Sequence, residues 1–412
     1  MRVGVVGAGI GGLSAAAGLL KLGHSVTLFE QAQELREVGA GVQISPNGNR
    51  ALDWLGCFEA VAQTSWEPTV KQFRHWQTGR AWPMFDLNDA WTERYEYPYF
   101  TVYRPDLLDA LANRVRQLSP VSLCLNQQCI GVEQSPHEAV LSFADGTRKS
   151  FDIVLGADGV HSVIRQQLFG DDQPTFSGME AWRCVVPTSE LPEPLQRGNG
   201  TIWIGPHGHA VTYPLRGNAL VNFVGVMGRS TWQTESWTAE AAREDGLATF
   251  ADWHPELHRL LEAAPSLSRW ALMVREPMAR WSLGRVTLMG DACHPTLPFL
   301  AQGAVHAIED GVVFARCLTH FEGDPLQALR SYEAARLDRT GRMVRQAKAN
   351  THRFQNDALV SEASAELYVQ RELNARTLSE KYDWLYRYDA SSCPLPVSSS
   401  DSASGASVVH HV

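Results

Sequence analysis

The first thirty residues divide into short stretches with distinct hydrophobic patterns. Val3 to Val6 contain only valine and glycine, which predicts a buried strand, and Ser25 to Glu30 predict a second one. Between them, Ile10 to Leu22 carry an alanine-rich apolar pattern with helical spacing. A strand, a glycine turn, a helix and a strand within about thirty residues form a βαβ unit. The N-terminal pattern therefore predicts an α/β protein.

The rest of the chain alternates between strand-rich and helix-rich stretches. Residues 65–100 hold many aromatic side chains and few helix signals, and residues 175–275 are strand-like with glycine-bearing turns. Strands are expected at 121–125, 129–133, 139–144, 152–156, 201–204, 209–215, 221–226 and 285–290. Helices are expected from about Pro105 to Leu118, from Ala304 onward, from Leu326 to about Arg353, and on through Tyr382.

This alternation, over a length of 412 residues, favours two closely packed domains whose pieces interleave along the chain. A Rossmann-type domain is expected from residues 1–65, 100–175 and 277–325. A β-sheet domain is expected from residues 66–99 and 176–276. Residues 326–390 are expected to form C-terminal helices, and the serine-rich residues 391–412 a disordered tail.

Composition narrows the functional classes. The formal net charge of −9 leaves no basic footprint, so nucleic acid is not an expected partner. The seven cysteines form no CxxC pair and no Cys/His metal spacing, so no metal site is expected. The cysteines are expected to be reduced thiols in a cytosol. Neither a signal peptide nor an apolar run near the ~18 residues of a membrane span is visible. The chain is expected to be cytoplasmic, without a membrane partner.

A glycine motif gives the first chemical indication. Gly7, Gly9 and Gly12 form GxGxxG directly after the first strand and at the start of the helix. Gly7 permits the turn, Gly9 lets the backbone approach a pyrophosphate, and Gly12 lets the helix pack against the sheet. Glu30, followed by Gln31, ends the second strand, where an acid accepts ribose hydroxyls. The motif predicts a dinucleotide, FAD or NAD, and a glycine-rich turn in a core is the alternative.

Three further stretches carry a family resemblance. Residues 156–165 (GADGVHSVIR), 285–295 (RVTLMGDACHP) and 298–310, in this order, resemble the flavoprotein aromatic hydroxylases typified by para-hydroxybenzoate hydroxylase. Within that family the sequence is most similar to salicylate, 3-hydroxybenzoate and 6-hydroxynicotinate hydroxylases. The resemblance covers roughly residues 1 to 390 and implies FAD as the cofactor, with NADH or NADPH as co-substrate.

The resemblance also implies roles for individual residues. Asp158 and Gly159 are expected near the FAD ribose, and Gly290 and Asp291 at the ribityl chain. Arg104 stands where the family has a flavin-contacting arginine at a helix start, with a surface salt bridge as the alternative. The flavin loop and the helix after it are expected to contribute Pro298, Gln302, Gly303 and Ala304.

On the substrate side, His209 and Tyr213 lie four residues apart on an expected strand, so both side chains share one face. They resemble a His-xxx-Tyr pair beside the substrate ring in the 3-hydroxybenzoate and 6-hydroxynicotinate hydroxylases. An ordinary histidine pKa of ~6.5 suits His209 as a base toward a substrate hydroxyl, which Tyr213 would orient. The alternative is a half-exposed histidine and a core tyrosine.

The chain departs from those relatives at other substrate positions. Gln43 and Phe299 stand where 6-hydroxynicotinate hydroxylases place histidines, and Pro298 where a 3-hydroxybenzoate hydroxylase has glutamine. Arg183 could bind a carboxylate but is more often structural on such a strand. The identity of the substrate therefore stays open.

The expected function is that of a single-component monooxygenase. NAD(P)H reduces FAD, dioxygen forms a flavin hydroperoxide, and a small aromatic substrate (phenolic, carboxylated or a hydroxypyridine) attacks the distal oxygen. A homodimer is a family-level expectation. The alternatives are a flavin-dependent halogenase or epoxidase on the same scaffold, or a non-catalytic binding protein similar to GDP-dissociation inhibitors.

Overall fold

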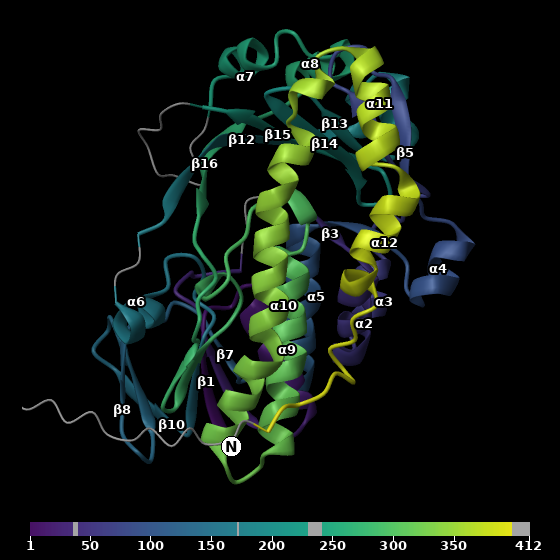
Figure 1. Ribbon diagram of the computed structural model, residues 1–412. Coiled ribbons are helices and arrows are strands. Elements are labelled where there is room, and N and C mark those ends of the chain that lie inside the picture. Colours follow the sequence, from purple (N-terminus) through teal and green to yellow (C-terminus); the bar gives the residue numbers. More distant parts are fainter. Residues whose placement is uncertain (36–39, 171–172, 230–240, 398–412) are drawn as a thin grey trace, which may run out of the picture.

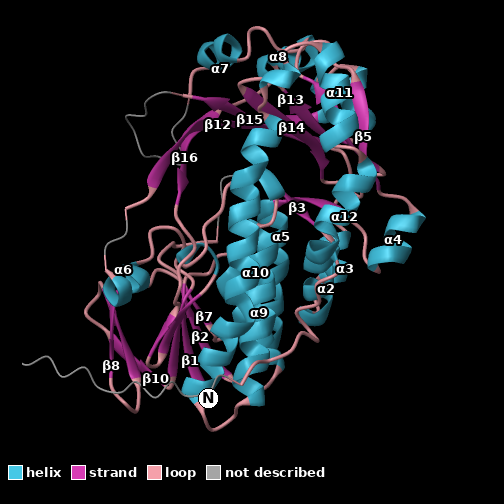
Figure 2. Cartoon of the chain, viewed as in Figure 1, coloured by secondary structure: helices cyan, strands magenta, loops and turns pink. Residues whose placement is uncertain are grey.

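The structure is a computed structural model that describes residues 1–35, 40–170, 173–229 and 241–397 (Figure 1). Two β-sheets occupy opposite ends of the molecule, and long helices run between them (Figure 2). The expected mixed α/β fold class with a Rossmann-type unit is confirmed. The elements named below belong to the described residues.

A six-stranded sheet forms the unit that contains the N-terminus. Its strand order is β17-β18-β11-β1-β2-β7. The strands are β17 (Ser282–Leu283), β18 (Val286–Leu288), β11 (Ile153–Gly156), β1 (Arg2–Val6), β2 (Ser25–Phe29) and β7 (Leu123–Cys124). All of its pairings are parallel except β17 with β18. The predicted βαβ unit is therefore confirmed as β1, α1 and β2.

Helices cover this sheet because its strands are apolar on both faces. Val3, Leu28 and Leu155 are fully buried, as parallel strands between helices require. The surrounding helices are α1 (Ile10–Lys21), α2 (Pro46–Leu55), α3 (Phe58–Ala62), α5 (Arg104–Leu118), α6 (Val163–Phe169) and α9 (Gly303–His320). A small antiparallel sheet of β8 (Cys129–Gln134), β9 (Ala139–Phe143) and β10 (Arg148–Phe151) flanks the unit.

A seven-stranded sheet forms the other unit, in the order β16-β12-β15-β14-β13-β4-β5. The strands are β16 (Ser268–Val274), β12 (Thr175–Pro187), β15 (Leu220–Gly228), β14 (Gly208–Leu215), β13 (Gly200–Ile204), β4 (Val70–His75) and β5 (Ala81–Asp86). Their pairings are antiparallel except that of β13 with β4. One sheet thus joins segments from two distant parts of the chain.

The two faces of this sheet pack against different partners. Trp182, Trp203 and Phe223 on one face form a buried cluster with α7 (Arg243–Thr249) and α8 (Pro255–Glu262). Ile202 and Val226 on the other face belong to a second cluster with the C-terminal helices. Those helices are α10 (Pro325–Phe354), α11 (Glu362–Glu372) and α12 (Ala375–Tyr386).

Three short helices lie where the sequence indicated strands or irregular chain. They are α4 (Asp89–Tyr95), α7 and α8. Polar side chains start two of them: Asn88 Oδ1 accepts from the Ala90 amide, and His254 Nδ1 accepts from the Glu256 amide. Each is eight residues or fewer, too short for a hydrophobic period to stand out, so the prediction for these stretches was wrong.

Helix α10 connects the two units. Its 30 residues run beside α9 and reach the seven-stranded sheet, where the Gly205 amide donates to the Phe354 carbonyl (Figure 1). A two-stranded sheet, β3 (Gly41–Ile44) with β6 (Phe100–Tyr103), forms a second connection, because Thr101 Oγ1 donates to the Pro214 carbonyl on β14. These connections fix the space between the sheets.

The chain after α12 returns to the first unit. The tail was expected to start at Ser391, but the structure describes the chain up to residue 397. Arg316 holds this part by donating hydrogen bonds to the carbonyls of Ala390 and Cys393. Residues 398–412 of that expected tail lie outside the described residues. Within the described ranges no helix combines the length and apolarity that a membrane crossing requires. The same ranges hold no cluster of three or more His, Cys, Asp or Glu side chains suited to a metal ion.

Candidate active site

A cavity of about 330 Å³ lies between the two sheets. The glycine loop before α1 and the loop before α9 form one side, and β14, β15 and β16 form the other. The expected site residues that line it are Gly9, Arg104, Gly159, Gly290, Asp291, Pro298, Gln302, Gly303, Ala304, His209 and Tyr213. Those that do not are Gly7, Gly12, Glu30, Gln31 and Asp158. Residues far apart in sequence thus meet at one space.

The glycine loop presents bare backbone to this cavity. A Cβ atom on Gly12 would lie 1.9 Å from the Gly7 carbonyl oxygen, so only glycine lets the helix start so close to the turn. Gly9, by contrast, has nothing within 4 Å of where a Cβ would stand. The backbone at the start of α1 therefore borders free space, as a bound pyrophosphate would need.

Glu30 supports the loop from outside the cavity. One carboxylate oxygen accepts from the Ala8 amide at 2.8 Å and the other from the Ala32 amide at 2.9 Å. The side chain of Gln31 is exposed. Glu30 thereby fixes the glycine turn through the backbone and keeps lone pairs for a ribose hydroxyl.

Asp158 holds a turn in place behind the cavity. It accepts from Ser162 Oγ at 2.5 Å and from the Ile164 amide at 3.2 Å, at the start of α6. Burial raises the pKa of this carboxyl. Its neighbour Gly159 lines the cavity. Asp158 positions the segment rather than facing the cavity itself.

The chain after β18 lines the cavity with polar groups. Asp291, in a short 3-10 turn (Gly290–Ala292), is exposed toward the cavity, where its carboxylate suits a polyhydroxyl chain. The loop then passes Ala301, whose φ of 53° is left-handed, and enters α9 at Gly303. The first amides of this 18-residue helix point at the cavity, where they favour negative charge. These features fit FAD.

A buried polar network holds the loop before α9, which includes Pro298 and Gln302. Gln302 Nε2 donates to Ser45 Oγ at 2.9 Å, and Asn47 Nδ2 donates to Glu309 at 2.8 Å. Arg339 then pairs with Glu309 at 2.8 Å. Ser45 and Asn47 were missed from the sequence, although two polar residues beside the first turn of a helix, around Pro46, are a recognisable N-terminal signal.

The adjacent half of the network centres on Asp310. Its carboxylate pairs with Arg336 at 2.6 Å and His294 at 2.7 Å, and accepts from the Gly290 amide at 3.2 Å. Burial alone would raise the pKa of Asp310, but His294 and the Arg336 guanidinium outweigh it and hold the pKa at about 2. His294 and Arg336 thus have structural roles here.

His209 is buried, so its pKa departs from the ordinary value of a histidine. Its side chain is 2% exposed, and burial lowers its pKa to about 3, so the ring is neutral. The Gln355 amide nitrogen, a donor, lies 3.0 Å from Nδ1, which places the ring proton on Nε2. The rings of Phe299 and Phe354 pack against it. His209 thus carries its ring proton on Nε2 and has a pKa below the ordinary value of ~6.5, and its role toward a substrate stays a prediction.

Tyr213 is fixed by close packing. A Cβ on Gly41 would lie 2.4 Å from Tyr213 Cε2 and 2.8 Å from its hydroxyl oxygen. Gly41 itself cannot retreat freely, because its amide donates to Asn222 Oδ1 at 2.9 Å. Burial raises the pKa of Tyr213, which keeps the phenol protonated. Arg183 also lines the cavity, with its guanidinium 4.5 Å above the Trp270 ring.

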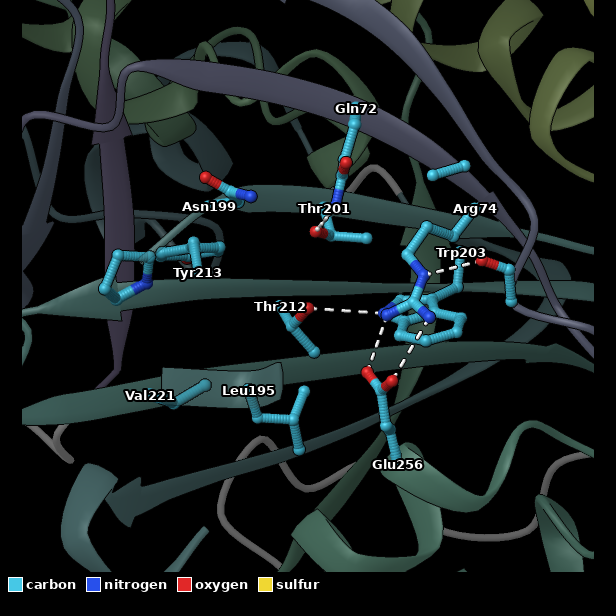
Figure 3. Close-up of a pocket in the computed structure, with 13 residues that line it drawn as sticks. Gln72, Arg74, Leu195, Asn199, Thr201, Trp203, Thr212, Tyr213, Val221 and Glu256 are labelled. Atoms are coloured by element: carbon cyan, nitrogen blue, oxygen red, sulfur yellow. Dashed lines mark hydrogen bonds and ion pairs between the residues drawn. The ribbon is translucent and has the colours of Figure 1, made fainter. Parts of the chain in front are cut away.

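A second cavity, of about 340 Å³, lies on the opposite face of the seven-stranded sheet (Figure 3). The two cavities are similar in volume, so the residues that line each one decide which is the candidate active site. Arg74 dominates its wall, but Glu256 neutralises the guanidinium at 2.6 Å and Trp203 stacks 4.1 Å from it. No residue of the flavin loops lines it, so the cavity between the sheets is the candidate active site.

Comparisons with known proteins agree with this assignment. A family model described as FAD binding domain matches residues 1–347. A 3-amino-4-hydroxybenzoate 2-monooxygenase, PtmB3 from Streptomyces platensis, is 36% identical over 94% of this chain and 96% of its own length. A 6-hydroxynicotinate 3-monooxygenase from Pseudomonas fluorescens is 35% identical over 85% of this chain and 91% of its own length. Among solved structures, Klebsiella pneumoniae HpxO complexed with FAD and uric acid superposes with a TM-score of 0.81, at 26% identity over 96% of this chain and 98% of that one.

Proposed function

The chain belongs to the FAD binding domain family as an FAD-dependent aromatic hydroxylase, and we propose that it adds one oxygen atom of dioxygen to a small carboxylated or nitrogen-containing aromatic ring with NADH or NADPH as reductant. The balanced reaction converts a ring C–H, dioxygen, NAD(P)H and a proton into a ring C–OH, NAD(P)⁺ and water. The seven free thiols support placing this reaction in the cytoplasm.

The observation that carries the proposal is the shared cavity. The loops expected to hold FAD and the His209/Tyr213 pair expected to hold a ring line one space, although they belong to different sheets. FAD, when bound, supplies the electron transfer and the oxygen activation. The protein's contribution is to position the ring and to exclude water from the space around it.

Each side chain has a definite part in this scheme. Asp291 and the amides of α1 and α9 would hold the cofactor. Neutral His209 would donate from Nε2 to an oxygen substituent of the ring, and Tyr213 would hold the same substituent from its fixed position. Val211, Val224 and Leu272 line the cavity as flat apolar contacts for the ring.

The test is oxidation of NADH and NADPH by the purified, FAD-loaded protein, with oxygen uptake, across hydroxybenzoates, aminohydroxybenzoates and hydroxypyridines. We expect at least one compound to stimulate both rates and to emerge heavier by one oxygen, or with carboxylate replaced by hydroxyl. The proposal fails if the protein is yellow but no aromatic compound stimulates oxidation or changes mass.

A further inference from the structure

A buried lysine stands on the same face of the seven-stranded sheet as His209 and Tyr213. Lys71, on β4, is 7% exposed and forms no ion pair with the described residues. Its Nζ lies 2.9 Å from the Tyr99 hydroxyl and 4.5 Å from the centre of that ring. Burial lowers the pKa of Lys71 to about 7. A cation placed in a core without a carboxylate is costly, which suggests a use for its charge.

The hydrogen bonds from Lys71 run in one direction, from its ammonium group to Tyr99 and from Tyr99 to Gln43 at the cavity. An ammonium group can only donate, so the Tyr99 oxygen accepts from Lys71. The Tyr99 hydroxyl then donates to Gln43 Oε1 at 2.8 Å. Gln43 lines the cavity, and its amide also carries a donor, Nε2.

The neighbouring residues leave this end of the cavity rich in donors. Lys71 on β4 pairs with Gly200 on β13. On the other side of β13, Thr201 pairs with Thr212 of β14, so Tyr213 lies beside Gly200. Gly200 has no side chain to separate Lys71 from Tyr213. The acidic residue lining the cavity within the described chain is Asp291, on the flavin loop of the other unit.

We propose that Gln43, with Lys71 behind it through Tyr99, forms an anion subsite that holds a carboxylate on the aromatic substrate. The proposal rests on the hydroxylase function above and deepens it by naming a substituent. Gln43 would contact the carboxylate, while Lys71 and Tyr99 are positioning residues that polarise and orient its amide. His209 and Tyr213 remain free to hold the ring's oxygen substituent.

The test compares each acid with its uncharged isostere. The FAD-loaded protein is titrated, with flavin absorbance as the readout, with 3-amino-4-hydroxybenzoate, 3-hydroxybenzoate and 6-hydroxynicotinate and with their three carboxamides. The wild type is expected to bind at least one acid about tenfold or more tightly than its amide, as charge-assisted hydrogen bonds allow. Lys71→Met is expected to remove that preference, leaving amide binding within about twofold of the wild type.

Three further variants separate the charge from packing. Tyr99→Phe removes the hydroxyl that links Lys71 to Gln43 and keeps both of those residues, so it is expected to reduce the acid preference as Lys71→Met does. Each of the two variants tests the subsite if the other folds poorly. Lys71→Arg is expected to restore part of the preference. The matched control is Lys348→Met, a surface lysine 59% exposed and paired with Glu276, which should bind both probes as the wild type does.

The pH dependence gives an independent readout. The charged and titratable groups that act on Tyr99, Tyr213 and Tyr386, besides one another, are Tyr95, Tyr382 and Arg183. His75 and His209 lie on the same face of the sheet as Lys71. Burial raises the pKa of each of these tyrosines and lowers the pKa of both histidines, and an arginine keeps its charge in proteins. Lys71, with a pKa of about 7, is therefore the group expected to titrate between pH 6 and pH 8. Raising the pH through about 7 should therefore weaken acid binding by the wild type and leave its amide binding unchanged. In Lys71→Met, neither acid binding nor amide binding should change over this range.

The subsite is refuted if no acid binds more tightly than its amide, or if Lys71→Met and Tyr99→Phe weaken acid and amide equally. Such a result leaves the hydroxylase function standing, because that function is judged by substrate-stimulated oxidation and product mass. A failure of every aromatic compound in the oxidation assay would instead remove the function on which the subsite depends.

Discussion

At the residue scale, the substrate side of the cavity depends on side chains that are held rather than free. His209 keeps one tautomer because Gln355 occupies Nδ1, and Tyr213 keeps one position because it rests on Gly41. The spacing of His209 and Tyr213 indicated a shared face, but nothing local to either residue indicates Gln355 or Gly41, which are 146 and 172 positions away from His209 and Tyr213 (355 − 209 and 213 − 41). Contacts of this kind come from the tertiary fold.

Replacing Gly41 by alanine is expected to displace the Tyr213 ring, because the added methyl group would overlap Cε2 and the hydroxyl. Turnover should fall about ten- to a hundredfold, while FAD content stays at the wild-type level. Steady-state kinetics and the flavin-to-protein absorbance ratio measure the two effects. Gly228→Ala, at the exposed end of β15 where an added Cβ would make only ordinary van der Waals contact, is the control for a glycine that does not line the cavity. An active Gly41→Ala enzyme would show that Tyr213 needs no fixed position.

Replacing Gln355 by glutamate is expected to reverse the His209 tautomer. A carboxylate accepts rather than donates, so Nδ1 would take the proton and Nε2 would lose it, and the nearby charge would raise the pKa of His209. Turnover should fall about tenfold or more if Nε2 donates to the substrate. Nitrogen-15 NMR of labelled histidine reads the tautomer directly. Gln117→Glu, at an exposed position of α5, is the charge-matched control.

At the element scale, the start of α9 is held in place by hydrogen bonds and buried ion pairs. Gln302 at its N-terminus is tied to Ser45, Glu309 and Asp310 lie within its next two turns, and both acids meet arginines of α10. This polar layer connects the helix that points at the cavity to the helix that joins the two units.

Replacing Arg336 by methionine is expected to destabilise the protein by about 3–5 kcal/mol, because Asp310 would lose its guanidinium partner while remaining fully buried. Urea unfolding followed by fluorescence measures the change, and FAD retention should fall with it. Arg376→Met removes an exposed helix pair whose side chains are 88% and 67% exposed, and should change little. A stable Arg336→Met protein that retains FAD would contradict the supporting role.

Much of the element order follows from the sequence, for identifiable reasons. The βαβ unit, the strands at 201–226 and the long C-terminal helix are long or strongly periodic, and the structure has each of them. Short α4, α7 and α8 were missed because a helix of two turns carries too little period to outweigh its surroundings. Lys71 was missed because a single lysine in a strand is ordinarily exposed, and only the sheet order shows it buried beside Tyr99.

At the scale of the whole molecule, two units share one cavity, and α10 spans them both. A ligand that fills such a cavity bonds to both units, so it stabilises their arrangement as well as each wall. The bound cofactor should therefore act on the unfolding of the entire described chain.

Removal of FAD is expected to lower the thermal unfolding midpoint, and the midpoint should rise with added FAD by mass action. At free FAD a hundredfold above its dissociation constant the stabilisation should be about 2.7 kcal/mol. Calorimetry across a series of FAD concentrations gives the curve, with riboflavin, which lacks the diphosphate, as the control ligand. Equal stabilisation by riboflavin would argue against the diphosphate site at α1.

The pairing of β4 with β13 also sets an order of events while the protein is being made. Gln72 and Thr201 share a hydrogen bond across these strands although 129 residues separate them. At about 5–20 residues per second, a ribosome leaves β4 and β5 as a hairpin with an open edge for several seconds before β13 emerges. Expression yield should therefore depend on how fast that intervening segment is translated and on what shelters the open edge meanwhile.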